Sequence, residues 1–415
     1  MHIKLLYLVS VFLIFENTSL SKYAGVFTAS LAMVLLPVVT GFLILSQKRI
    51  GMLEKHIVFL YIAFFLYSLL MLIFNYYDNF RIGFLLDRGL RFALLALPSL
   101  IFFIFFCSFE EKALEKALLI FSMSIFIIYI LNIFFPSIFN ASSFFQGSFA
   151  HSPHRMRGLT LEASTFGFQV GIAAIFSARY YKLSRIMSFL LICVVIYVTT
   201  SKGGLITFSL SFLIAVLIHK KTVKTTKSLL LFTFLALSPI LYLEVLLPAF
   251  SSDIEKYNSS ATRSTMILVS IFSLFDHPLG VGFFGYLPSI YENGKEVIQS
   301  IEEIMPNVFN YKEVSTYLYF GAVKGVSTKS FIFDWLIYFG AIFLFYLFKV
   351  VKWYLNNLRE GDFYFLVMFL FMLMSVTFYL PIDGRFIVPL VLAFLYKSIC
   401  NKNKCNKNKC NRELA

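Results

Sequence analysis

The sequence predicts an all-helical polytopic membrane protein with about twelve transmembrane helices and one large loop on the outer side. Of its 415 residues, 59% are hydrophobic and only 14% are charged, which is more apolar surface than a soluble core needs. The apolar residues form runs of spanning length, and alternate connections between these runs are basic. We therefore expect a single transmembrane domain over residues 1–400 and a basic tail over 401–415.

The apolar runs place the expected spans in order along the chain. They lie at about 3–20, 24–45, 57–74, 92–108, 115–135, 158–179, 186–200, 203–218, 229–249, 331–349, 363–381 and 386–400. The first run has no small-residue cleavage site, so we interpret it as a retained span and not as a signal peptide. The tail repeats Asn-Lys-Asn-Lys-Cys and is expected to be disordered.

Basic residues indicate the orientation of these spans. They cluster at 47–55, 179–185, 219–227, 349–359 and in the tail, which all fall on one side of the membrane if the runs alternate in direction. Cytoplasmic loops collect lysine and arginine, so we predict that these segments and both termini are cytoplasmic. Much of the net charge of +14 is then explained by topology and not by nucleic-acid binding. The five cysteines fall in spans or on the cytoplasmic side and indicate neither a disulfide nor a metal site.

One outer segment, roughly 250–330, is too long to be a plain connector and is expected to be functional. It holds six basic and eight acidic residues, which is typical of an outer loop. Ile267, Leu268, Ile271, Phe272 and Phe275 recur at helical spacing within it. This pattern predicts an amphipathic helix over 262–275, at the boundary between membrane and water, that ends before Pro278 and Gly280.

Five cations break the orientation rule, because they fall at outer helix ends or loops: Arg155, Arg157, Lys202, Arg263 and Arg385. Cations held there need an anionic partner, and a lipid-linked pyrophosphate has suitable chemistry.

Each motif around these cations has two interpretations. Arg157 and Glu162 form either an interfacial ion pair or an anion clamp with a base. Lys202 either extends to lipid headgroups or binds an anion. Arg385 either pairs with Asp383 inside a short turn or faces substrate. His277 is either a helix-end hydrogen-bonding residue or a catalyst.

Glycines at 280, 282 and 285 formally match a dinucleotide-binding pattern. No strand is expected before them, so we interpret these glycines as a turn.

Several segments, in their order along the chain, resemble the O-antigen polymerase and ligase superfamily of bacterial envelopes. They are 157–164 (Arg-Gly-Leu-Thr-Leu-Glu-Ala-Ser), 201–204 (Ser-Lys-Gly-Gly), Arg263 with 276–282 (Asp-His-Pro-Leu-Gly-Val-Gly), and 327–331 with 338–340. The likeness covers roughly 150–345. It implies a helical glycosyltransferase of the bacterial inner membrane that polymerises glycan repeat units carried on undecaprenyl pyrophosphate at the periplasmic face. It implies no metal and no cofactor. The expected partners are the lipid-linked glycan, membrane lipid and a chain-length regulator, and not nucleic acid.

The resemblance also implies that Arg157 and Arg263, with Lys202, hold the pyrophosphate. Together with the residues considered above, we expect Arg157, Glu162, Arg263 and His277 to be catalytic, and Arg155, Lys202, Lys329 and Arg385 to bind substrate. Lys202 stands where the family commonly has arginine, and a lysine cannot offer a bidentate fork. Thr328-Lys329 stands where ligases typically have a histidine, which favours a polymerase over a ligase.

A flippase for lipid-linked sugars is the main alternative from another class. A flippase should carry charges across the membrane midplane and show two similar halves, whereas here the ionisable residues collect at outer ends.

Overall fold

The computed structural model describes residues 2–20, 30–46, 52–74, 80–140, 155–240, 243, 259–304, 306, 309–318, 326–381 and 385–402. Within these ranges the chain is helical and contains no strand, as the apolar runs predict. The elements are α1 (His2–Phe12), the 3₁₀ helix η2 (Leu31–Leu35), α3 (Leu36–Leu45), α4 (Met52–Phe74), α5 (Ile82–Cys107), α6 (Glu111–Phe134), α7 (Pro136–Asn140), α8 (Ala163–Tyr180), α9 (Arg185–Val198), α10 (Lys202–Ile218), α11 (Lys224–Ile240), α13 (Ser259–Asp276), α14 (Tyr286–Ile304), α15 (Lys312–Ser315), α16 (Phe331–Leu358), α17 (Phe363–Phe378) and α18 (Ile387–Lys402).

Four of the described helices are long and apolar enough to cross a membrane: Leu53–Phe74, Ile82–Cys107, Glu111–Phe134 and Phe331–Leu358. Shorter apolar helices accompany them, among them Arg185–Val198, Lys202–Ile218 and Phe363–Phe378. Several spans expected from the sequence are therefore present as helices that are shorter than a full crossing. The molecule is an all-helical protein with membrane-spanning helices.

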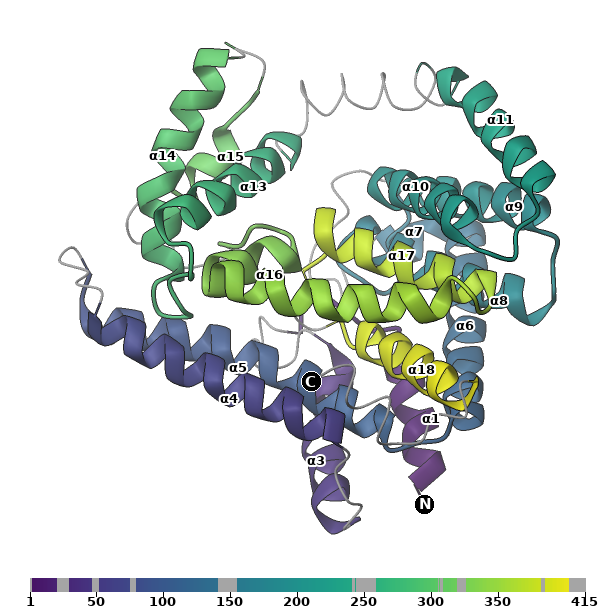
Figure 1. Cartoon of the computed structure of the whole chain (residues 1–415), viewed down its shortest axis with the longest axis horizontal. Coiled ribbons are helices and arrows are strands. Elements are labelled where there is room, and N and C mark those ends of the chain that lie inside the picture. The colour runs from purple at the N-terminus through teal and green to yellow at the C-terminus, as the bar shows by residue number, and fades with distance from the viewer. Residues whose placement is uncertain are drawn as a thin grey trace.

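Two apolar cores hold the helices together. In the first, α8 is buried on nearly all sides between α6, α9, α10 and α17, and α18 packs on α5 and α6. In the second, α13 and α14 pack against the first half of α16, with side chains of α4 and α5 closing the cluster. In Figure 1, α13, α14 and α15 gather at one side of the molecule, while α8, α9 and α10 lie at the other.

The first expected span is wrong in its second half. Helix α1 ends at Phe12, and residues 13–20 form an irregular, mostly buried segment instead of continuing to residue 20. Asn17 adopts a left-handed conformation (φ 53°), and Glu16 is completely buried. A continuing helix would leave this carboxyl group facing apolar neighbours, whereas the irregular segment brings it to hydrogen-bond donors.

Two other boundaries also differ from the apolar runs. Helix α5 begins at Ile82, about ten residues before the expected start, and it accommodates Asp87, which pairs with Arg88 (3.3 Å) and Arg91 (3.0 Å). Helix α8 begins at Ala163, later than expected, and Gly158 at the expected start has a φ of +52°, which a right-handed helix cannot include.

The long segment over roughly 250–330, which is expected to lie outside, contains three of the described helices, α13, α14 and α15. The helix expected over 262–275 is confirmed as α13. Met266 and Val269 are fully buried. The residues of the expected apolar face are less covered: Ile267, Leu268, Ile271 and Phe272 are half-buried, and Phe275 is 77% exposed. The covered face of α13 packs on α14 and α16, so part of its apolar face stays open.

The glycines of 280–282 and 340 are structural. The N–H groups of Val281 and Gly282 donate to the carbonyl oxygens of Ile337 (3.0 Å) and Tyr338 (2.8 Å) in α16. Gly340 has non-helical angles (φ 48°, ψ −132°), and a Cβ there would lie 2.2 Å from the Pro278 oxygen. The interpretation as a turn is confirmed, and this turn docks on a kink in α16.

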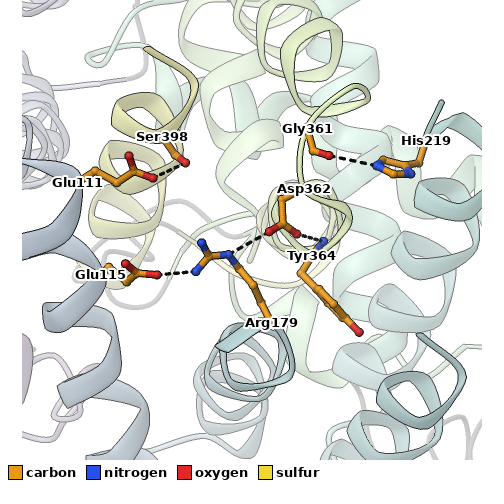
Figure 2. A network of polar contacts seen from close by, with 8 residues as sticks. All are labelled: Glu111, Glu115, Arg179, His219, Gly361, Asp362, Tyr364 and Ser398. Carbon is orange, nitrogen blue, oxygen red and sulfur yellow. Dashed lines mark hydrogen bonds and ion pairs between the residues drawn. The ribbon is translucent and has the colours of Figure 1, made fainter. Parts of the chain in front are cut away.

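Segments expected to be cytoplasmic meet at one end of the bundle. Arg179 at the end of α8 donates to Glu115 of α6 (2.6 Å) and to Asp362 before α17 (3.1 Å), as Figure 2 shows. Ser398 of α18 donates to Glu111 of α6 at 2.6 Å. We refer to these five residues as the Arg179 network. Because α8 has 18 residues, its other end lies about 27 Å away from this network.

Candidate functional site

Arg157 is held in the turn that leads into α8. Its side chain is only 4% exposed, and its Nε donates to the carbonyl oxygen of Phe139 at 3.1 Å. The N–H of Gly158 donates to Asn132 Oδ1 of α6 at 3.0 Å, and the Thr160 hydroxyl lies 2.9 Å from the Arg157 oxygen. Burial lowers the pKa of the Arg157 guanidinium from its ordinary value. The turn therefore fixes a partly desolvated cation beside the start of α8.

Glu162 is exposed at the N-terminal end of α8, where the Ser164 hydroxyl donates to its Oε2 at 3.2 Å. Across from it lies Tyr317, which follows α15 and donates to Glu313 Oε1 at 2.7 Å. Burial, the hydrogen bond to Glu313 and the charges of Glu313 and Glu162 all raise the pKa of Tyr317. Lys329 Nζ lies 5.2 Å from the centre of the Tyr317 ring. Glu162 and Lys329 are thus brought to the same tyrosine from distant parts of the chain.

Lys202 is the first residue of α10 and is half-buried. The Ser201 hydroxyl caps this helix by accepting from the Gly204 N–H at 3.3 Å. Thr200 has a φ of 57°, which is strained for a β-branched residue. A Cβ at Gly167 of α8 would lie 2.3 Å from Ser201 Cβ, so the turn packs directly on α8.

Arg263 lies in the first turns of α13. Its charge affects the pKa of Tyr379, the residue that follows α17. Burial raises the pKa of Tyr379 to about 12, and the Arg263 charge opposes this shift. The same tyrosine ring packs on Gly203, where a Cβ would lie 3.2 Å from its Cδ1. Tyr379 therefore packs on the Lys202 turn and lies within electrostatic range of Arg263.

The turn that carries Lys329 is anchored to the end of α17. Lys329 adopts a left-handed conformation (φ 60°). The Ser330 hydroxyl donates to the Thr377 oxygen at 2.5 Å, and the Thr328 N–H donates to Asp334 Oδ1 at 2.8 Å. Tyr286 of α14 also donates to Asp334. Contacts with α14, α16 and the end of α17 therefore fix the position of Lys329 in spite of its strained backbone.

Arg385 is 5% exposed and lies just before α18. Its Nη2 donates to Thr165 Oγ1, in the first turn of α8, at 3.1 Å. Asp383, the alternative partner expected within the same turn, lies outside the described residues.

The structure thus brings most of the expected site residues to one end of the bundle. Arg157, Glu162 and Arg385 border the start of α8, and Lys202, Arg263 and Lys329 border the start of α10 and the end of α17. We refer to these six residues as the outer-end site. Arg155 is exposed at the start of a described segment, and no described contact ties it to the others.

His277 is not part of this group. It follows α13, whereas Arg263 lies near the start of that helix, so the two are about 20 Å apart along the axis. Its main-chain N–H donates to the Ser273 oxygen at 2.9 Å, and its charge acts on Glu292 of α14.

Sequence reasoning missed four buried or half-buried polar residues in or beside this site: Glu16, Gln169, Tyr317 and Tyr379. Glu16 carried a usable signal, because a carboxylate inside an apolar run is rare in membrane proteins. The two tyrosines carried none, since the chain has 23 tyrosines and only tertiary contacts single these out.

Chemically, the outer-end site can bind an anion. Two helices of more than fifteen residues, α8 and α10, begin here, and the N-terminal end of a helix favours negative charge. The five cations of the site lie around these helix starts, and one exposed carboxylate, Glu162, lies among them. No group of three or more histidine, cysteine or acidic side chains suited to a metal occurs in the described ranges.

The chain is 34% identical over 409 residues to an uncharacterized 49.5 kDa protein in the cps region of Klebsiella pneumoniae, covering 96% of this chain and 92% of that protein. No protein-family model and no solved structure matches the chain.

Proposed function

Because the chain belongs to one family with the 49.5 kDa protein of the Klebsiella pneumoniae cps region, we propose that it polymerises the repeat units of a surface polysaccharide. The substrate in this proposal is an oligosaccharide linked to undecaprenyl pyrophosphate, and the reaction takes place at the periplasmic face of the inner membrane. The observation that carries the proposal is the outer-end site, at the opposite end of α8 from the Arg179 network.

The pyrophosphate of the lipid carrier is the group that this site suits. Arg157 and Arg263 can each present a planar fork to phosphate oxygens, and Lys202 and Lys329 can add point charges. The N-terminal ends of α8 and α10 contribute main-chain donors to the same region. These cations also stabilise the charge that develops on the pyrophosphate as it leaves, which lowers the barrier to glycosyl transfer.

The proposed reaction is a displacement at the first sugar carbon of the growing chain. A hydroxyl group of the incoming repeat unit forms a bond to that carbon, while the bond from the carbon to the pyrophosphate oxygen breaks. Undecaprenyl pyrophosphate leaves with the bonding electron pair, and the hydroxyl proton passes to a base. Glu162 is our candidate for that base, because it is an exposed carboxylate within the ring of cations.

Two alternatives remain as outcomes of an experiment. A ligase would pass the finished chain to lipid A-core, and a flippase would move single units across the membrane. The ligase alternative is disfavoured because Thr328 and Lys329 occupy the place of the ligase histidine. Against the flippase, the expected substrate-binding cations gather at one end of the bundle.

Electrophoresis of surface polysaccharide from a deletion strain tests the proposal. We expect an acceptor that bears one repeat unit and no ladder of longer chains, with the ladder restored by the intact gene. Long chains that accumulate on the lipid carrier would indicate a ligase. Single units trapped on the cytoplasmic side would indicate a flippase, and an unchanged ladder would refute a polymerase.

A further inference from the structure

Glu16 lies at the centre of a polar cluster that joins three distant parts of the chain. Its side chain is completely buried in the irregular segment after α1. Its Oε1 accepts from the main-chain N–H of Ile387 at 2.9 Å, two residues after Arg385. Its Oε2 accepts from Gln169 Nε2 of α8 at 3.2 Å. The Glu16 carboxyl group therefore ties the segment before α18 to α8.

Gln169 and Thr165 occupy one face of α8, because they are four residues apart. Thr165 accepts from Arg385, and Gln169 donates to Glu16 and also to the Leu13 oxygen at 3.0 Å. One face of α8 thus binds both the arginine and the carboxyl group next to it. The α8 residues beside Glu16 are neutral. Among the described neighbours, Arg385 is the charged residue that affects the pKa of Glu16.

The same irregular segment contacts the Arg157 turn. The carbonyl oxygen of Asn17, which is in a left-handed conformation, accepts from the Leu161 N–H at 2.8 Å. Leu161 immediately precedes Glu162. Residues 13–20 therefore contact both of the segments that carry buried arginines of the outer-end site, 155–162 and 385–387.

We propose that Glu16 is a positioning residue for Arg385, and that its ionised form competes with a bound pyrophosphate for that arginine. This inference rests on the proposed function, because it assigns Arg385 to the pyrophosphate subsite. The hydrogen bond to Ile387 and the contact through Gln169 set where Arg385 is held. The hydrogen bond from Ile387 does not require the carboxyl group to be charged, since the carbonyl oxygen of a neutral acid or of an amide also accepts.

The charge of Glu16 acts in the opposite sense. Burial raises the pKa of Glu16. The main-chain hydrogen bond from Ile387 and the Arg385 charge both lower it by less, so the resulting pKa is about 8. The group is therefore mostly neutral at pH 7 and ionises above pH 8. Once ionised, it neutralises part of the Arg385 charge and repels an anion bound there.

The test uses the purified full-length protein in detergent micelles, with inorganic pyrophosphate as the probe and calorimetry as the measurement. We expect Glu16→Gln to bind pyrophosphate as the wild type does at pH 7, and about tenfold more tightly than the wild type at pH 9. The ratio of the two affinities at each pH is the readout, because pyrophosphate itself also titrates in this range. Glu16→Ala removes the hydrogen-bond acceptor and should weaken binding at both pH values.

Glu111→Gln is the matched control. Glu111 also accepts from α18, through Ser398 Oγ (2.6 Å) and Asn401 Nδ2 (2.8 Å), but it belongs to the opposite end of the bundle. This variant should bind pyrophosphate as the wild type does at both pH values.

The possible failures can be told apart. A folded wild type that binds no pyrophosphate overturns the proposed function and the role of Glu16 together. Normal wild-type binding with an affinity ratio of one for Glu16→Gln at pH 9 overturns the competition. Normal binding by a folded Glu16→Ala variant overturns the positioning role. Melting temperatures of each variant show which of them are folded.

Discussion

The main-chain N–H of Gly282 donates to the carbonyl oxygen of Tyr338 at 2.8 Å, across 56 positions of the sequence. Two of the segments that carry the family resemblance, 276–282 and 338–340, are therefore in direct contact. The contact is possible because glycines at 280, 282 and 340 all have positive φ and carry no Cβ. It joins the turn after α13 to α16, and so fixes the helix that carries Arg263 against the helix that follows Lys329.

Gly340→Ala should remove most of the folded protein. Its Cβ would lie 2.2 Å from the Pro278 oxygen, and its φ and ψ angles are unfavourable for any other residue, which costs on the order of 1–3 kcal/mol before any clash. The measurement is the yield and melting temperature of the detergent-purified protein. Gly83→Ala is the control, because no atom lies within 4 Å of its Cβ position in α5. A Gly340→Ala protein that melts like Gly83→Ala would contradict this account.

The helices could largely be predicted from the sequence, because apolar runs of this length have few other stable forms in a membrane. The boundaries could not be predicted as well. Residues 13–20 read as part of a span, since Leu13, Ile14 and Phe15 are apolar and the described partners of Glu16 lie 153 and 371 positions away. The start of α5 was missed because charged residues suggested a loop, whereas Asp87 pairs with arginines inside the helix.

The candidate site was likewise predictable from the sequence only in part. The cations could be found from the sequence because each breaks the charge pattern of the loops. Their grouping could not, since it depends on Tyr317 and Tyr379, which are linked to Glu162 and Arg263 only in the folded chain. His277 shows the converse case, because a motif close to Arg263 in sequence lies at the far end of the same helix.

Reporter fusions should place residue 300 of α14 outside the cytoplasm and the C-terminus inside it. The reason is the contrast between the acidic outer segment and the basic segments that meet around the Arg179 network. An alkaline phosphatase fusion after Ser300 should be active and one after Lys402 inactive, with a fluorescent-protein fusion giving the reverse pattern. Phosphatase activity only at the C-terminus would invert the topology and the proposed site with it.

Asp362→Ala should lower the melting temperature of the detergent-purified protein, by an amount that corresponds to about 1–2 kcal/mol. Asp362 caps α17 by accepting from the Tyr364 N–H at 2.9 Å, and it also accepts from Arg179 at 3.1 Å. Its neighbour Glu360 supplies the control, because Glu360 pairs with Lys220 in full contact with solvent, where an ion pair contributes little. Equal melting temperatures for Asp362→Ala and Glu360→Ala would show that the Arg179 network does not stabilise the fold.

Thermal stability should fall as pH rises through the range in which Glu16 ionises. The pKa of this carboxyl group is about 8 in the folded chain against an ordinary value of 4.5, so folding favours the protonated form. The stability that it contributes is full below pH 4.5 and is lost progressively as pH rises to about 8. Glu16→Gln should therefore show a smaller decrease in melting temperature between pH 5 and pH 8 than the wild type. Parallel curves for the two proteins would mean that folding does not raise the pKa of Glu16.

Arg157→Ala and Arg263→Ala should each abolish or sharply reduce polysaccharide ladders in a complemented deletion strain. Charge-assisted hydrogen bonds to phosphate are about twice as strong as neutral ones, and both side chains lie at the outer-end site. Arginine to lysine at either position should restore only part of the ladder, because the bidentate geometry is lost. The readout is gel electrophoresis of surface polysaccharide, with immunoblots to verify equal amounts of membrane-inserted protein.

Lys220→Ala is the control for these variants, since it removes an exposed cation from the opposite end of the bundle. It should give a full ladder. A full ladder from Arg157→Ala would remove that arginine from the site, and the same result for Arg263→Ala would remove the contribution of α13. If both alanine variants gave full ladders, pyrophosphate binding by the outer-end site would be refuted, because the two arginines that offer it a bidentate fork would be dispensable.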